Sequence, residues 1–396
     1  MTRTMYILCA VLACLPAAMP AGAAEPDADS VAAGRYVHQI AADVVPGAIL
    51  HTNEFLRGGN PEMRTMNHNT GVRLKYAFAH PEASREAHVY RDAYQGVGIA
   101  YNSFNPQLGN PVSVFLLQGA RIASLSDKAS LNYEWNFGLA MGWNPYDEER
   151  NPYNKVIGSR VTAYMGIDMY VRWILSRHAD INIGLNVAHY SNGNTQYPNL
   201  GLNTAALRIG AAYYFNRRAT HLLYRHERLP KVSHTVTCDV ILYGAWRQRG
   251  TYYVGEAYAL PGKSAVYGFN INPMYRLNHW LKAGASLDGT YDRCANLIDL
   301  PTDGTDPDPY MLPSAAKQMA LGVSARAEFT MPYFAINIGV GTNVLNGSDD
   351  FGGVYETLAL KVALTRRALL HIGYCLNDFH VPKHLMLGVG WRFGRL

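Results

Sequence analysis

The stretch Ile181-Asn182-Ile183-Gly184-Leu185-Asn186-Val187-Ala188 alternates strictly between large apolar residues and small or polar ones. Successive side chains of a β-strand point to opposite faces, so one face of this strand is apolar throughout. Residues 159–175 and 384–393 alternate in the same way, and their second faces are polar or small. The outward faces of a soluble sandwich carry more Lys, Glu and Asp than this. The pattern therefore favours a membrane β-barrel, whose apolar face contacts lipid and whose polar face lines the lumen.

The rest of the chain from about residue 70 reads as further strands of this kind. The expected strands are 71–78, 94–101, 111–122, 131–142, 159–175, 180–190, 205–216, 236–247, 264–275, 280–291, 317–330, 333–342, 355–365, 369–376 and 384–393, with an additional one near 48–56. Short turns alternate with longer polar loops, as in bacterial barrels, which have even strand numbers. We expect one all-β, antiparallel outer-membrane barrel of 14–16 strands over residues 71–396, preceded by a partly irregular segment, 25–70.

The N-terminus has the features of a secretory signal peptide. Arg3 is followed by an apolar run over residues 5–18 and then by small residues up to Ala24. This order of a basic, an apolar and a small-residue region predicts cleavage and export, so residues 1–24 are expected to be the signal peptide. A lipoprotein signal at Cys14 is an alternative, although Leu12 fits that signal poorly. Later segments are too short to form a transmembrane helix.

Composition narrows the function further. The chain has 396 residues, 27 of them Tyr, and only 16% are charged. Abundant Tyr suits the aromatic belts of an outer-membrane barrel. The net charge of +5 is modest, and no basic cluster argues for nucleic acid. The cysteines outside the signal, Cys238, Cys294 and Cys375, do not form a disulfide framework. The histidines lack metal-ligand spacing, so neither a catalytic metal nor a cofactor is expected.

A weak internal similarity relates two parts of the chain. A basic turn at 176–178 precedes the strand that leads to His189, and a basic turn at 365–367 precedes a comparable strand. The second copy has no His-x-Ser sequence. Either a duplicated half-barrel or the shared pattern of hairpins explains the similarity, and we expect the hairpin pattern.

The sequence His189-Tyr190-Ser191-Asn192 follows the strand at 181–187. His189 and Ser191 continue its apolar, lipid-facing side, and Asn203 has the same orientation on the next strand, close to His189. Acyl transfer needs an activated hydroxyl, a base and donors for the oxyanion. Ser191 can act as nucleophile and His189 as base. Asn192 and the backbone N–H groups of Gly193 and Asn194 can stabilise the oxyanion. The alternative is a His and a Ser that only form hydrogen bonds at the membrane interface.

The longer pattern of His-Tyr-Ser-Asn, then Pro198-Asn199 and Gly201, resembles the lipid A 3-O-deacylase (PagL-type) family of small outer-membrane barrels. The resemblance covers about residues 181–215. It implies that Ser191 and His189 are nucleophile and base, that Asn192 helps the oxyanion hole, and that the substrate is lipid A of lipopolysaccharide in the outer leaflet. A homodimer is a possibility that the sequence leaves open.

Two departures from the family keep other functions open. Asn203 stands where the family typically has a glutamate, and an Asn can hold the imidazole tautomer but cannot stabilise imidazolium by charge. The acidic residues 147–149 are a less favoured source of a carboxylate. The chain is also about twice as long as the simpler members, and a wider barrel has room for a lumen. The alternatives are a non-catalytic porin, a transporter of hydrophobic solutes, and a phospholipase that uses the same residues.

Overall fold

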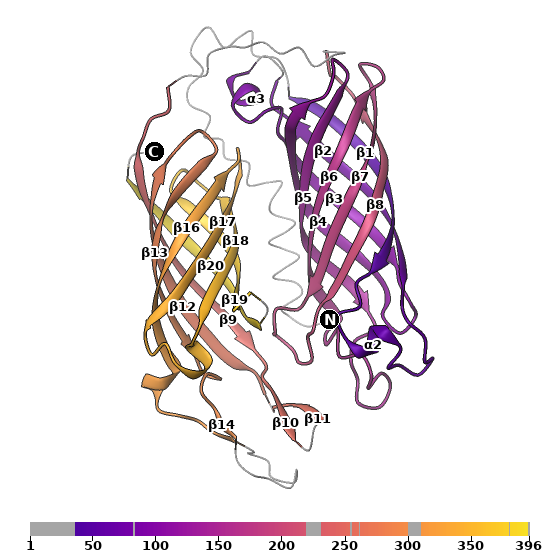
Figure 1. Ribbon diagram of the computed structural model, residues 1–396. Helices are drawn as coiled ribbons and strands as arrows, with labels where there is room; N and C mark the ends of the chain where they lie inside the picture. The colour runs from indigo at the N-terminus through magenta and orange to yellow at the C-terminus, as the bar shows by residue number, and fades with distance from the viewer. Residues whose placement is uncertain are drawn as a thin grey trace.

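The computed structural model shows two β-barrels, one after the other along the chain and side by side in space (Figure 1). It describes residues 36–81, 84–218, 231–253, 256–260, 262–299, 310–379 and 381–394. The signal-peptide prediction, residues 1–24, lies outside these ranges. No helix within them is long and apolar enough to cross a membrane.

Within the described ranges, eight strands close each barrel in antiparallel order. Barrel 1 contains β1 (Val37–Ile49), β2 (His68–Ala79), β3 (Tyr94–Ser103), β4 (Gly109–Ser124), β5 (Ala129–Trp143), β6 (Val161–Ile174), β7 (Ala179–Ser191) and β8 (Leu202–Tyr214). Barrel 2 contains β9 (Val236–Arg247), β12 (Ser264–Arg276), β13 (Leu281–Asp292), β16 (Met319–Thr330), β17 (Phe334–Leu345), β18 (Val354–Ala363), β19 (Ala368–Asn377) and β20 (Val381–Gly394).

Short helices, strand pairs and 3-10 turns lie in the connections between the barrel strands. They are α2 (Glu54–Arg57), α3 (Arg85–Val89), the paired strands β10 (Gly250–Tyr253) and β11 (Glu256–Ala259), the paired strands β14 (Ile298–Asp299) and β15 (Tyr310–Met311), and the 3-10 turns η2 (Ala315–Gln318) and η3 (Asp349–Phe351). We call the end of each barrel that carries the longer loops the loop end, and the opposite end the turn end. The loop ends of the two barrels point the same way, downward in Figure 1.

The all-β antiparallel barrel class is confirmed, but the expectation of one wide barrel is wrong. β8 pairs with β1 along its length, from Gln39 opposite Tyr214 to Ile49 opposite Thr204. The edge of β8 is therefore already occupied before β9 begins at Val236, and β9 closes a second barrel with β20. Strand periodicity predicts how many strands form, whereas closure depends on which edges pair.

The additional strand expected near 48–56 is also wrong. The strand that completes barrel 1 is β1, at Val37–Ile49, and α2 occupies part of the expected range. β1 alternates poorly and contains Pro46, which has no N–H to donate. Its pairing with β8 is interrupted between Val44 and Gly47, where Pro46 lies. These features hide β1 from a search for apolar alternation.

Both barrels have polar interiors and apolar exteriors. On β2, Val72, Leu74 and Tyr76 face outward and are 42–58% exposed, whereas Arg73 and Lys75 between them are 3% and 4% exposed. This distribution is the reverse of a soluble protein and matches a barrel surrounded by lipid.

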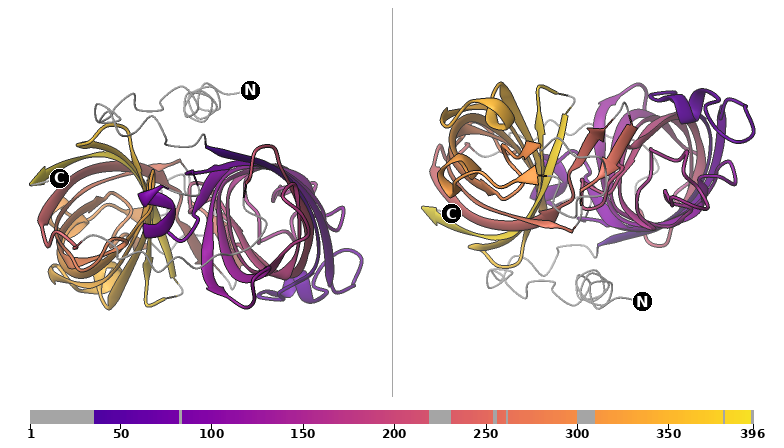
Figure 2. Two further views of the ribbon diagram at one scale, coloured as in Figure 1. Left: turned by 90° about the horizontal axis from the view of Figure 1, so that it is seen from above. Right: turned by 90° about the horizontal axis from the view of Figure 1, so that it is seen from below.

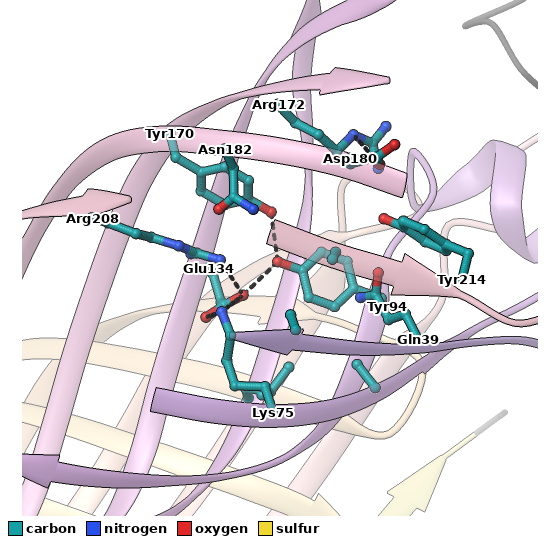
Figure 3. Close-up of a pocket in the computed structure, with 14 residues that line it drawn as sticks. Gln39, Lys75, Tyr94, Glu134, Tyr170, Arg172, Asp180, Asn182, Arg208 and Tyr214 are labelled. Atoms are coloured by element: carbon teal, nitrogen blue, oxygen red, sulfur yellow. Dashed lines mark hydrogen bonds and ion pairs between the residues drawn. The ribbon is translucent and has the colours of Figure 1, made fainter. Parts of the chain in front are cut away.

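Paired charges fill the interior of barrel 1. Lys75 Nζ lies 2.6 Å from Asp43 and 3.0 Å from Glu134, and Arg208 reaches the same two carboxylates at 3.3 Å. Tyr94 donates to Glu134, its hydroxyl lies 2.7 Å from that of Tyr170, and all three residues line a small cavity (Figure 3). An eight-stranded barrel is just wide enough for side chains to fill it.

The interior of barrel 2 is filled in the same manner. Glu328 contacts Lys282 and Lys361 at 3.1 and 2.7 Å, and Arg326 contacts Asp288 at 2.8 Å. The described side chains of both barrels thus occupy their interiors with ion pairs, which is not the arrangement of a wide pore.

The barrels contact each other through part of their apolar exteriors. Leu116 and Trp135, on the outside of β4 and β5, are only 7% and 8% exposed because they pack against Leu360 and Val362 of β18. Trp135 also meets Phe334 edge to face, with ring centroids 5.7 Å apart. The views along the barrel axes show these walls adjoining (Figure 2).

The internal similarity relates equivalent strands of the two barrels. The turn at 176–178 leads into β7 and the turn at 365–367 leads into β19, and each is the seventh strand of its barrel. The two matching segments therefore occupy corresponding positions in successive barrels, which the general pattern of hairpins does not require.

Candidate functional site

The candidate site lies at the loop end of barrel 1, where β7 ends. Tyr190 points into the barrel and is 2% exposed, with its ring 5.3 Å from Tyr164 and 5.1 Å from Trp143. Because neighbouring strand residues alternate, this anchored ring places His189 and Ser191 on the outer face. The sequence pattern Ile-x-Ile-x-Leu-x-Val-x-His-x-Ser thus produces a polar pair at the end of an apolar strip.

His189 is held by Asn203 across the β7–β8 hairpin. The two residues are directly opposite in register, and Nδ1 of His189 lies 2.6 Å from Oδ1 of Asn203. An amide oxygen only accepts hydrogen bonds, so this contact requires the tautomer that carries its proton on Nδ1. The lone pair of Nε2 is then available to accept a proton from a hydroxyl group. The carboxylate of Asp168, on the neighbouring strand β6, does not contact His189, because it is buried inside the barrel beside Arg73.

The loop that follows β7, residues 192–201, folds over Ser191. We call it the catalytic loop, after the role that is proposed for Ser191 below. It leaves Ser191 7% exposed although the side chain is on the outer face of the strand. The backbone N–H of Gly193 donates to Ser191 Oγ at 3.1 Å, and the side-chain amide of Asn199 donates to the same atom at 2.8 Å. Two hydrogen-bond donors therefore converge on the hydroxyl oxygen.

Asn199 is the site residue that sequence reasoning missed. Its Nδ2 bonds to Ser191 Oγ, while its Oδ1 accepts the backbone N–H of Asn192 at 3.0 Å. The signal was present, because Asn199 belongs to the Pro-Asn-x-Gly part of the motif. Spacing alone does not reveal that a side chain eight residues further along the chain turns back onto the serine.

The predicted oxyanion residues lie together but differ in their contacts. Asn192 directs its amide to the backbone oxygen of Gln196 at 2.8 Å, inside the catalytic loop. Gly193 and Asn194 have φ angles of 65° and 61°, a backbone conformation that bends the chain sharply beside Ser191. Gly193 faces the serine through its N–H. Asn194 instead extends its side chain away, toward barrel 2.

Gly201 brings the end of the catalytic loop against the histidine. Its φ angle is 74°, and a Cβ atom there would lie 2.9 Å from Cε1 of His189. The backbone N–H groups of Leu200 and Gly201 bond to the backbone oxygens of Lys155 and Val156. The 143–158 loop of barrel 1 thus supports this half of the catalytic loop.

Asp147, the first of the acidic residues at 147–149, forms its hydrogen bonds within its own loop. Asp147 accepts backbone N–H groups from Glu149 and Arg150, and these bonds hold the pKa of its carboxyl below the usual value. The His189 ring forms a hydrogen bond with Asn203, and no cluster of three metal-ligating side chains occurs in the ranges that the structure describes. The arrangement is a hydroxyl, an imidazole and an amide, with donors on the hydroxyl oxygen, on the outer face of barrel 1.

Two family models match this chain. The family model described as lipid A 3-O-deacylase (PagL) matches residues 70–212, and the model described as acyloxyacyl hydrolase, C-terminal domain, matches residues 236–395. Together they cover most of the chain, leaving β1 of barrel 1 outside the matched ranges. A search of curated proteins finds no match.

Solved outer-membrane barrels are among the structural matches. The outer membrane enzyme PagL is 14% identical, covering 43% of this chain and 97% of its own, with a TM-score of 0.29. The siderophore receptor FauA of Bordetella pertussis is 10% identical, covering 91% and 76%, with a TM-score of 0.25. A mutant porin of Rh. blastica is 7% identical, covering 91% and 100%, with a TM-score of 0.18. From the two family matches, the chain belongs to the PagL family of lipid A 3-O-deacylases, carries the acyloxyacyl hydrolase C-terminal domain, and is an ester hydrolase of the bacterial outer membrane.

Proposed function

We propose that this protein removes an ester-linked acyl chain from lipid A in the outer leaflet, with Ser191 as nucleophile and His189 as general base. The observation that carries the proposal is the position of Ser191. Its Oγ lies on the outer face of the barrel, one pleat from a histidine whose Nδ1 is held by Asn203. A soluble substrate would not need a site on this face, whereas a lipid reaches it by lateral diffusion.

The proposed reaction begins when Ser191 Oγ attacks the ester carbonyl and its proton passes to Nε2 of His189. Asn203 keeps the imidazole in the required tautomer throughout. The negative charge develops on the former carbonyl oxygen, and the donors beside Oγ, the Gly193 N–H and the Asn199 amide, are placed to stabilise it. His189 then returns the proton to the departing sugar hydroxyl. A water molecule then gives a proton to His189 and attacks the acyl carbonyl, the bond between this carbon and Ser191 Oγ breaks, and His189 returns the proton to Oγ as the fatty acid leaves.

Asn192 and Asn194 take supporting parts in this proposal. Asn192 closes the catalytic loop through Gln196, and its N–H is held by Asn199. Asn194 places its neighbour Gly193 through the sharp bend of the backbone. Catalysis by donors requires that they are held before the charge develops, so these contacts have a direct chemical purpose.

The outer surfaces beside the site suit acyl chains. Leu185, Val187 and Leu207 lie on the same outer face as His189 and are 49–63% exposed. Acyl chains of a neighbouring lipid can rest along this strip while the ester reaches Ser191. The filled interiors of both barrels favour this use of the outer face over passage of solutes through a lumen.

Mass spectrometry of lipid A tests the proposal. A Gram-negative host would produce the wild type, Ser191→Ala, or the control Ser126→Ala, whose serine caps the turn between β4 and β5 at the opposite end of barrel 1. Heat-modifiable gel mobility would verify that each variant is folded. We expect loss of one acyl mass with the wild type and Ser126→Ala but not with Ser191→Ala. Unchanged lipid A with folded wild type would contradict the proposal, and loss of phospholipid acyl chains instead would identify a phospholipase.

A further inference from the structure

The catalytic loop of barrel 1 is bonded to barrel 2. Asn194 Nδ2 donates to the backbone oxygen of Pro382 at 2.7 Å, and the backbone N–H of Gln248 donates to the backbone oxygen of Asn194 at 2.8 Å. Pro382 lies in β20 and Gln248 directly follows β9, two strands that pair in barrel 2. Asn194 is therefore held by both strands at the loop end of the other barrel.

The side chain of Gln248 makes a second connection between the barrels. Its Oε1 accepts the backbone N–H of Tyr197 at 3.0 Å, and its Nε2 donates to the backbone oxygen of Leu260 at 3.1 Å. One glutamine thus joins the catalytic loop to two segments of barrel 2. The Tyr197 ring lies against Gly250, where a Cβ atom would come within 2.3 Å of it.

The catalytic loop also makes an apolar contact with barrel 2, next to Ser191. A Cβ atom on Gly193 would lie 2.6 Å from Cγ of Leu385, so the Gly193 backbone rests directly on this β20 side chain. Gly193 supplies the N–H that bonds to Ser191 Oγ. The backbone donor beside the nucleophile is therefore in contact with barrel 2.

The second donor on the serine is also connected to barrel 2. Asn199 Nδ2 bonds both to Ser191 Oγ at 2.8 Å and to Asn194 Oδ1 at 3.2 Å. The other amide atom of Asn194 bonds to Pro382. A continuous series of hydrogen bonds thus runs from β20 through Asn194 and Asn199 to the nucleophile.

Each barrel forms hydrogen bonds with a different part of the catalytic loop. The 143–158 loop of barrel 1 bonds to its last residues, Leu200 and Gly201, whereas barrel 2 bonds to Asn194 and Tyr197. The contacts with barrel 2 position the two donors beside Ser191, which are the Gly193 N–H and the Asn199 amide. Misplacement of a reacting group by about 1 Å costs roughly 100-fold in rate, so contacts that fix the donors matter to catalysis even when they do not touch the substrate.

We infer that barrel 2 completes the active site of barrel 1, and that Gln248 is a positioning residue for deacylation. Gln248 acts through Tyr197 and Asn194 on the donors beside Ser191. This inference rests on the proposed function, because it assigns a role to the same serine. It also assigns a purpose to the second barrel, whose interior is filled and which contributes no nucleophile to the constellation described above.

Two substitutions at one position test the inference in the full chain. Gln248→Leu removes both amide atoms at similar size, whereas Gln248→Glu keeps the acceptor for the Tyr197 N–H. Gln318→Leu is the matched control. Gln318 lies at the same end of barrel 2, where it is buried while Gln248 is half-buried. It donates to the backbone oxygen of Arg293 at 3.0 Å, and in the described residues it has no bond to the catalytic loop.

The measurement is kcat and KM on purified lipid A in detergent micelles, with folding verified by gel mobility. We expect Gln248→Leu to lower kcat by roughly 10-fold or more while KM stays within about threefold. Gln248→Glu should recover most of the rate, and Gln318→Leu should resemble the wild type. If Gln248 only stabilised the fold, Gln248→Leu would lower the folded fraction, and the folded enzyme would show no fall in kcat at constant KM.

Other results would overturn either the inference or the proposed function, and the two cases can be distinguished. Equal kcat for folded Gln248→Leu and Gln318→Leu would overturn the inference and leave the proposed function intact. Folded wild type without deacylation would overturn the proposed function itself. If Gln248→Leu fails to fold, Asn194→Asp decides, because it keeps the acceptor for Asn199 and removes the donor to Pro382. Wild-type kcat in Asn194→Asp would then overturn the inference.

Discussion

His189 Nδ1 and Asn203 Oδ1 lie 2.6 Å apart and belong to directly opposed residues of β7 and β8. The amide replaces the carboxylate that would stabilise imidazolium by charge, but it still selects the tautomer with a free Nε2. The site is therefore arranged for a base whose orientation is secured by the hairpin and whose charge is not compensated.

Substitutions of Asn203 separate orientation from charge. Asn203→Leu should lower kcat by roughly 10- to 100-fold, because the imidazole loses the bond that selects its tautomer. Asn203→Asp should keep that bond, add a charge that stabilises imidazolium, and raise kcat several-fold. Steady-state kinetics on purified lipid A would measure both. Wild-type kcat in Asn203→Leu would show that His189 is oriented by another contact.

Asn199 should be needed for the chemical step. Asn199→Asp keeps the acceptor for the Asn192 N–H but removes the amide donor to Ser191 Oγ. Loss of one oxyanion donor costs roughly 100- to 1,000-fold in kcat, and we expect a reduction in this range with little change in KM. Asn199→Ala, which also removes the loop contact, should be no more active. An active Asn199→Asp enzyme would exclude Asn199 from the oxyanion hole.

Gly201→Ala should displace His189, the proposed general base. The new Cβ atom would lie 2.9 Å from Cε1 of His189, at a φ angle of 74° that already disfavours alanine. Gly262→Ala is a matched control, since its φ angle is 79° and nothing lies within 4 Å of the added atom. We expect kcat to fall roughly 10-fold or more only in Gly201→Ala. Equal activity of the two variants would show that the ring moves aside without loss of function.

The charged interior of barrel 1 should contribute to stability more than to catalysis. Glu134 is 1% exposed and contacts Lys75 and Arg208. Glu134→Gln leaves these cations without full compensation, and breaking a buried ion pair costs about 3–5 kcal/mol. Denaturant unfolding in detergent would measure the loss against Glu149→Gln in an exposed loop. A Glu134→Gln barrel as stable as the control would show that water or rearrangement replaces the carboxylate.

Neither barrel should conduct ions as a wide pore. Side chains fill both eight-stranded interiors, whereas aqueous channels need barrels of about 16 strands. Planar-bilayer recordings of the full chain should therefore show no stable porin-like conductance, with a known porin inserted in the same bilayers as the control. Steps of porin size that persist in Ser191→Ala would instead support the transport alternative.

The sequence alone determined the class of fold and the face on which the site lies. Alternation of apolar and polar residues has the same period as the strand, so it predicts membrane strands and the outward direction of His189, Ser191 and Asn203. The sequence could not show that the strands close two barrels, because each local pattern is the same whether β8 pairs with β1 or with β9. Nor could it reveal β1, whose alternation is interrupted around Pro46.

Only the tertiary structure decided which groups surround Ser191, the proposed nucleophile. The return of Asn199 onto Ser191 depends on the path of the catalytic loop, and the contacts of Gln248 and Leu385 with that loop depend on how the two barrels pack. Such contacts join residues that are between eight and about two hundred positions apart along the chain. Their partners are selected by the geometry of closed and packed barrels, for which a local sequence pattern carries no signal.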